Sequence, residues 1–111
     1  MTYVSPTPTP PYYAVVFTSI NADTDHTEHT AMYGRMLELA RTYDGFLGIE
    51  PARNPDGTGV AVSYWRDLET IGRWARDREH QEAKEKGRRL WYDHFMIRID
   101  KVERDYGRPD G

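Results

Sequence analysis

Hydrophobic positions gather in four separate stretches of the chain, and each stretch predicts a β-strand. The first, residues 12–20, is aromatic and β-branched without a breaker, as in strands that are buried on both faces. The next two, residues 46–53 and 58–66, flank Asn54-Pro55-Asp56-Gly57, which is typical of a tight turn and predicts a β-hairpin. In the last stretch, residues 91–103, successive side chains alternate between the two faces of the strand. One face carries Phe95, Ile97 and Ile99, and the other carries His94, Met96 and Arg98.

Two regions with a helical period lie between these strands. In the first, apolar residues recur at three- and four-residue intervals up to Tyr43, and Gly45 ends the helix. In the second, Asp67 caps a helix that breaks near Asp77 and continues over residues 79–89. This order predicts a ferredoxin-like βαββαβ fold of the α+β class, in which helices cover one face of a four-stranded antiparallel sheet.

Both faces of the predicted sheet carry apolar side chains. In the first strand, Tyr13, Val15 and Phe17 alternate with apolar residues on the opposite face. Helices cover only one face, so the other would expose a larger apolar patch than soluble monomers usually carry. We therefore expect a homodimer in which the uncovered sheet faces pack together, as in a dimeric α+β barrel.

The chain has 111 residues, which suits a single domain over residues 12–105. Residues 1–11 contain prolines spaced by threonine and predict an extended N-terminal tail, and residues 106–111 predict a short C-terminal tail. The sequence has neither the hydrophobic core of a signal peptide nor an apolar run of membrane-spanning length. We expect a cytoplasmic protein without a membrane partner.

Charge and cysteine content narrow the possible functions. The formal net charge is −3, and the basic residues between positions 84 and 89 alternate with Glu82 and Glu85, which favours a solvated helix face over a nucleic-acid site. The absence of cysteine excludes disulfides and thiolate chemistry. His26 and His29 have helical spacing, but their polar surroundings favour capping and solvation, so we predict no metal site.

Three motifs together resemble the antibiotic-biosynthesis-monooxygenase family of dimeric α+β barrels. They are a Gly-Phe-Leu-Gly strand entry at residues 45–48, a strand that ends in Tyr64 and Trp65, and a following helix that carries Trp74 and His80. The resemblance covers most of residues 12–103. It implies face-to-face dimers with a pocket between sheet and helices in each protomer.

The resemblance also implies candidate activities. Some members oxidise anthrone-like polyketides without metal or flavin, and others degrade haem with an Asn on the first strand, a Trp and a His. Trp65 and His80 match the Trp and the His of the haem-degrading members. Residues 12–20 contain no Asn, however, and the spacing from Trp65 to His80 is longer than in the haem-degrading members. We therefore expect a monooxygenase without a cofactor that acts on a small aromatic or polycyclic molecule. A non-catalytic ligand-binding or regulatory dimer is the alternative, and a haem-binding or haem-degrading enzyme is the third hypothesis.

The candidate catalytic residues are His80, as general base, and Trp65, as part of an aromatic wall that excludes water. Each has an ordinary structural alternative, since an indole at a strand end is often part of the core and a histidine beside Glu79 is often exposed. The candidate substrate-binding residues are Phe17, Tyr33, Trp74 and His94. Adjacent strand residues point to opposite faces, so Asp93 is poorly placed to orient His94.

Overall fold

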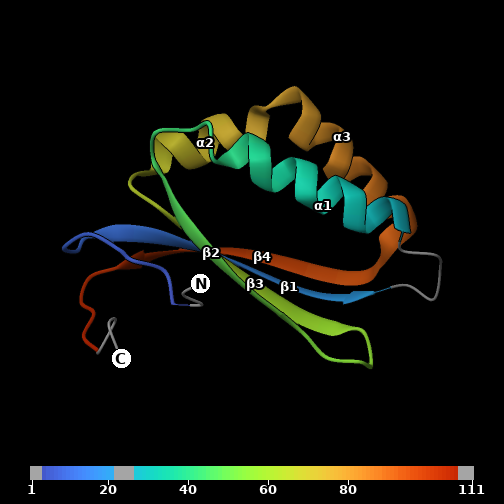
Figure 1. Ribbon diagram of the computed structural model, residues 1–111, viewed down its shortest axis with the longest axis horizontal. Coiled ribbons are helices and arrows are strands. Elements are labelled where there is room, and N and C mark those ends of the chain that lie inside the picture. Colours follow the sequence, from blue (N-terminus) through green and yellow to red (C-terminus); the bar gives the residue numbers. More distant parts are fainter. Residues whose placement is uncertain (1–3, 22–26, 108–111) are drawn as a thin grey trace.

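The computed structural model describes residues 4–21 and 27–107. One four-stranded sheet forms a layer whose upper face is covered by the helices (Figure 1). None of the described helices is long and apolar enough to cross a bilayer. In chain order the elements are β1 (Tyr12–Asn21), α1 (Thr27–Ala40), β2 (Phe46–Arg53), β3 (Thr58–Trp65), α2 (Leu68–Arg76), α3 (Arg78–Lys86), the π-helical turn η1 (Gly87–Trp91) and β4 (Tyr92–Val102).

The strand order β2-β3-β1-β4, with every neighbouring pair antiparallel, confirms the predicted ferredoxin-like α+β fold. The register sets which side chains share a face. Phe17 of β1 lies beside Ala61 of β3 and Ile97 of β4, and Val15 lies beside Ser63 and Ile99. These side chains line the space beneath the helices. The alternation predicted for the last strand is therefore correct.

The predicted hairpin turn is present between β2 and β3. The Gly57 amide donates to the Asn54 carbonyl, and the Asp56 carboxylate accepts from the amide and hydroxyl of Thr58. Gly57 has a φ of 95°, a left-handed conformation that favours glycine. The Gly57 carbonyl also accepts from the amide of Asn21, which joins the turn to the end of β1.

Several element boundaries differ from prediction, among them the end of α1 and the start of β4. Helix α1 ends at Ala40, not beyond Tyr43, because the amides of Thr42 and Tyr43 already bond three residues back, to Leu39 and Ala40. The last strand begins one residue later than predicted because Trp91 belongs to the turn η1. That turn redirects the chain from α3 into β4 and brings a buried Trp91 beneath the helices.

Asp67 caps α2 as predicted and anchors the adjoining loop. Its carboxylate accepts from the amide and the hydroxyl of Thr70, and these two bonds hold the pKa of Asp67 at about 2, well below its usual range. Thr70 is buried directly against Gly45, where an added methyl group would collide with the Thr70 side chain. Gly45 therefore lets the chain that leaves α1 pass close to α2.

The face of the sheet away from the helices carries apolar side chains and a short return of the N-terminal segment. Tyr12 is buried there, and its hydroxyl donates to Asp105 over 2.5 Å. The Ser5 amide and the Tyr64 hydroxyl both donate to the Glu50 carboxylate, at 2.7 Å each. Burial and this bond raise the pKa of Tyr64 to about 12. Residues of the N-terminal tail thus contact the chain's own sheet.

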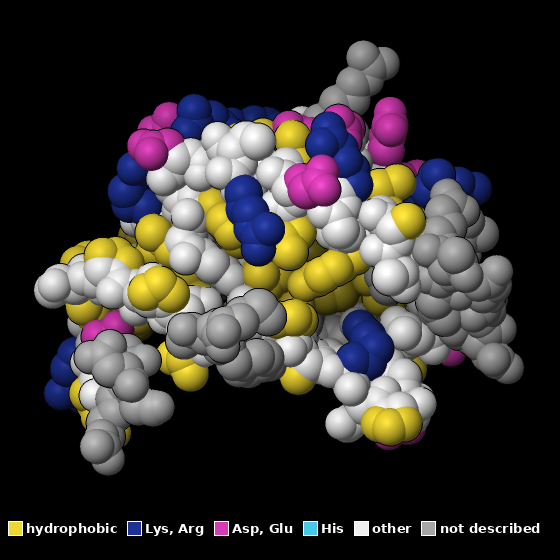
Figure 2. Space-filling view, in the orientation of Figure 1, with side chains coloured by type: hydrophobic (Ala, Val, Ile, Leu, Met, Phe, Trp, Pro, Cys, Tyr) yellow, Lys and Arg dark blue, Asp and Glu magenta, His cyan; other side chains and the backbone are white. Residues whose placement is uncertain are grey.

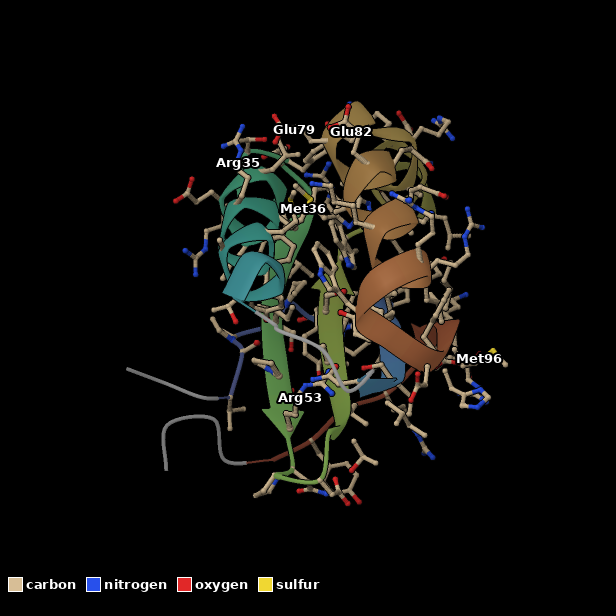
Figure 3. All side chains as sticks on the ribbon, turned by 90° about the vertical axis from the view of Figure 1, so that its right-hand side faces the viewer. Arg35, Met36, Arg53, Glu79, Glu82 and Met96 are labelled. Atoms are coloured by element: carbon tan, nitrogen blue, oxygen red, sulfur yellow. The ribbon has the colours of Figure 1, made fainter. Side chains whose placement is uncertain are left out.

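The rest of this outer face stays accessible in one protomer. Val60 and Met96 are 40% and 52% exposed, and Met96 points away from the molecule (Figure 3). The homodimer stays a prediction, in which a second copy covers this face at about 25 cal/mol per Å² of apolar surface removed from water. Sedimentation equilibrium should give twice the 13.0 kDa of one chain. A monomer at micromolar concentration would contradict it.

Candidate active site

A cavity of about 370 Å³ lies between the sheet and the helices. In the space-filling view, hydrophobic side chains form the floor of a hollow beneath the helix layer (Figure 2). Aliphatic and aromatic side chains supply most of the lining, and no Asp or Glu among the described residues belongs to it. Its ionisable members are Tyr33, His80, Lys84 and Tyr92. A cavity of this size and composition suits a small apolar molecule with few polar groups.

Trp65 forms the inner wall of the cavity and belongs to the core. It is 1% exposed, packs edge-on against Phe46 at 5.1 Å between ring centroids, and lies 6.0 Å from the Trp74 ring. Its indole N–H donates to the Ser63 hydroxyl over 2.9 Å. Because this bond occupies the only donor of the indole, Trp65 presents its apolar surface to the cavity.

His80 is held by the break between α2 and α3. Asp77 accepts from the amides of Glu79 and His80 and so caps α3, and its other oxygen accepts from the Tyr43 hydroxyl over 2.8 Å. These bonds hold the pKa of Asp77 below its usual value. The His80 ring stacks on Trp74 with centroids 4.0 Å apart. The cap and the stacking together place His80 in the cavity wall.

The tautomer of His80 follows from its hydrogen bond. Nδ1 lies 2.9 Å from the Trp74 carbonyl oxygen, which can only accept, so Nδ1 carries the proton and Nε2 has the free lone pair. No partner for Nε2 occurs among the residues that the structure describes. Burial lowers the pKa of His80 by disfavouring the charged ring. The imidazole therefore stays neutral at physiological pH and is available as a base.

An ion pair links the two helices above the cavity. The Arg35 guanidinium of α1 donates two bonds of 2.8 Å to the Glu79 carboxylate of α3. Figure 3 shows the two side chains pointing toward each other across the helices, with Met36 between α1 and α3. Met36 lines the cavity directly beneath this connection. This bidentate pair joins α1 to α3 near the start of α3, the end that carries His80.

The opposite end of the cavity is aromatic. Phe17 meets Tyr92 edge-on at 5.3 Å between centroids and Phe95 in a stacked arrangement at 6.0 Å. Burial raises the pKa of Tyr92 to about 12, so this phenol stays neutral. Tyr33 of α1 lines the same cavity and is partly exposed. Ile99 of β4 also lines the cavity and is 52% exposed.

Five of the six predicted site residues line this one cavity, and the sixth does not. Phe17, Tyr33, Trp65, Trp74 and His80 converge there from β1, α1, β3, α2 and α3. His94 is exposed on β4 and pairs with Ile20, on the face away from the helices. The alternation that puts Phe95 and Ile97 beneath the helices puts His94 on the other side.

Sequence reasoning misses several residues of the site. The hydrogen bond from Tyr43 to Asp77, which caps α3 just before His80, is not predicted, and Lys84 lines the cavity although it is an exposed residue on the predicted solvated face. The pattern predicts a regular strand through Trp91 and Tyr92, whereas the turn η1 brings both to the wall. The spacing of His80 and Lys84, four residues apart on one helix, is the available signal for Lys84.

The structure also bears on the sequence-based predictions about metal binding by histidines and about an Asn of the haem-degrading type on the first strand. Within the described part of residues 4–21 and 27–107, no group of three His, Asp or Glu side chains is arranged to hold a metal ion. His26 and the side chain of His29 lie outside what the structure describes. Strand β1 extends to Asn21, one residue beyond the predicted strand, but Asn21 is not among the residues that line the cavity.

Comparison with known proteins agrees with this architecture. Residues 17–100 match the family model described as monooxygenase af470-like. The uncharacterized protein YqjZ of Bacillus subtilis (strain 168) is 46% identical over 104 residues, which cover 94% of this chain and 90% of that protein. The family model spans every cavity-lining residue except Val15.

Solved structures share the fold at low sequence identity. One is a mutant of SnoaB from Streptomyces nogalater, a cofactor-independent oxygenase. It superposes with a TM-score of 0.72 at 14% identity, and the match covers 85% of this chain and 95% of the SnoaB chain. Rv0793 from Mycobacterium tuberculosis gives 0.74 at 11% identity, over 86% and 99%. A structure described as an antibiotic biosynthesis monooxygenase gives 0.70 at 10% identity, over 81% and 97%. This chain therefore belongs to the monooxygenase af470-like family and has the fold of the antibiotic-biosynthesis monooxygenases, as its motifs predict.

Proposed function

We propose that the protein is a monooxygenase that needs no tightly bound cofactor and oxidises a small aromatic or polycyclic molecule in the cavity. The observation that carries the proposal is the state of His80, whose Nδ1–H is bound to the Trp74 carbonyl, so that Nε2 has the lone pair of a general base. Membership of a monooxygenase family and the fold shared with SnoaB support the reaction class.

The proposed reaction begins with a weakly acidic C–H group, such as the methylene of an anthrone. His80 Nε2 takes the proton, and the carbanion delocalises over the aromatic rings. The carbanion transfers one electron to dioxygen, and the two radicals combine to form a C–O bond and a peroxide anion. The peroxide takes back the proton from the imidazolium, and loss of water then leaves a ketone. One dioxygen is consumed and one water is released for each ketone formed.

The cavity lining suits this chemistry. Trp65, Trp74 and Phe17 offer apolar surfaces to a flat ring system, and neither indole wall introduces a second base. Exclusion of water keeps the carbanion from being reprotonated before it meets dioxygen. The lowered pKa of His80 keeps the base neutral before substrate enters.

Anthrone is the test substrate. Purified protein treated with a chelator is mixed with anthrone in air-saturated buffer near neutral pH, with oxygen uptake and anthraquinone absorbance followed together. We expect catalysed uptake and product in a one-to-one ratio above the rate of spontaneous oxidation. Calorimetric binding of anthrone without turnover would contradict the proposal and support the non-catalytic ligand-binding alternative.

A further inference from the structure

Lys84 is a cation at the cavity that its own helix leaves unpaired. It lies one turn after His80 on α3, and both side chains belong to the lining. The positions three and four residues away are His80, Gln81, Gly87 and Arg88, none of which is acidic. No ion pair of Lys84 with any described residue is present.

Glu82 lies two positions before Lys84 on α3, a spacing that does not place two side chains on one helix face, and the other nearby carboxylates are held by other groups. Glu79 makes a bidentate pair with Arg35, and Asp77 accepts from Tyr43 and from the first amides of α3. Glu85 pairs with both Arg88 and Arg89. The described lining itself contains no Asp or Glu. Among the described residues, the cavity edge therefore carries the positive charge of Lys84 without an ion-pair partner, beside a mostly apolar wall.

We propose that Lys84 selects aromatic ligands that carry an anionic group, a carboxylate or a phenolate, and holds that group at the mouth of the cavity while the rings lie against the tryptophans. This inference rests on the proposed function, because it assumes that the cavity is the ligand site. Lys84 follows His80 by one turn of α3 and lines the same cavity, so an anionic group held by Lys84 would place the rings near the base. Lys84 is a positioning residue in this scheme, and His80 remains the base.

A matched pair of ligands tests the inference. Calorimetry at about pH 8, where His80 is neutral, compares 2-naphthoate with 2-naphthamide, which has the same rings and no charge. We expect naphthoate to bind about fivefold more tightly than naphthamide. This factor corresponds to the upper end of the free energy that an ion pair contributes when it remains partly in water. Raising the ionic strength should remove this preference and leave the affinity for naphthamide unchanged.

Lys84→Met retains much of the length and apolar stem of the side chain and removes the charge, so it should abolish the preference without weakening naphthamide binding. Lys84→Arg should retain the preference. Lys86→Met is the matched control, since it makes the same charge change two residues along α3 at a position outside the cavity lining. It should leave the preference intact.

The outcomes separate the two hypotheses. If both ligands bind equally to the unmodified protein, or if Lys84→Met retains the preference, Lys84 does not select anions, whereas the proposed function stands. If naphthamide and naphthoate both fail to bind while anthrone is turned over, this inference alone is overturned. If no aromatic ligand binds and anthrone is not oxidised, both this inference and the proposed function are wrong.

Discussion

Replacing His80 by glutamine should lower kcat/KM for anthrone oxidation by about 10² to 10⁴-fold, the contribution of a positioned general base. Glutamine fills much of the same space but has no lone pair of comparable basicity. The loss of the stacking on Trp74 and of the bond to its carbonyl should cost only about 1 kcal/mol of unfolding free energy. Turnover and chemical denaturation measured on the same preparation separate the two effects.

His94→Gln is the matched control for this substitution. His94 lies on the opposite face of the sheet, away from the cavity, so the control should leave turnover unchanged. The experiment also tests the prediction from sequence that His94 contacts substrate. Equal losses of turnover in both variants would contradict the assignment of His80 as the base.

The pH dependence of kcat/KM provides an independent test of His80 as the base. Burial lowers the pKa of His80 below the ordinary histidine value of about 6.5. The neutral base therefore persists to lower pH than a solvent-exposed histidine would, and kcat/KM should fall only as the pH drops through this lowered pKa. His80→Gln should remove this acidic limb, whereas a limb that persists unchanged in the variant would assign it to another group.

Trp65→Ala should reduce the unfolding free energy by about 3 to 5 kcal/mol, because it opens a cavity where the indole now packs against Phe46 and Trp74. Trp65→Phe should cost less, since most of the volume is retained. It still removes the donor to the Ser63 hydroxyl. Urea denaturation at fixed protein concentration measures both variants.

Tyr106→Ala provides the control, because Tyr106 is fully exposed and its removal should change stability by less than about 0.5 kcal/mol. If Trp65→Ala behaved like this control, the indole would not be part of the core. Anthrone turnover should fall less in Trp65→Phe than in His80→Gln, since Trp65 forms part of the cavity wall and transfers no proton in the proposed reaction.

The fold can be predicted because its signals are local. The run at residues 12–20 is typical of a buried strand, Gly57 ends a recognisable turn, and Asp67 precedes a helix with an apolar side. Their order then allows few topologies. The predicted end of α1 is wrong because Tyr43 continues the helical spacing, although tertiary packing on Trp74 and the bond to Asp77 hold it outside the helix.

The site is predictable only in part because it depends on contacts between distant segments. The convergence of Trp65, Trp74 and His80 follows from the hairpin and the next helix, and the family resemblance gives them a role. The Asp77 carboxylate that caps α3 before His80 also accepts from Tyr43, which lies 34 positions earlier in the chain. Nothing in the spacing of charges shows that Lys84, which remains exposed, also contributes to the cavity lining while Glu85 pairs with Arg88 and Arg89.

The chain contains three tryptophans, and all of them line the cavity. Nearly all of the protein's intrinsic fluorescence excited at the red edge of its absorption thus arises from Trp65, Trp74 and Trp91 at this one location. Trp65 and Trp74 lie 6.0 Å apart, close enough for excitation to pass between them before emission. A molecule that quenches one indole therefore dims the other as well, and the unlabelled protein reports on the occupancy of its own site.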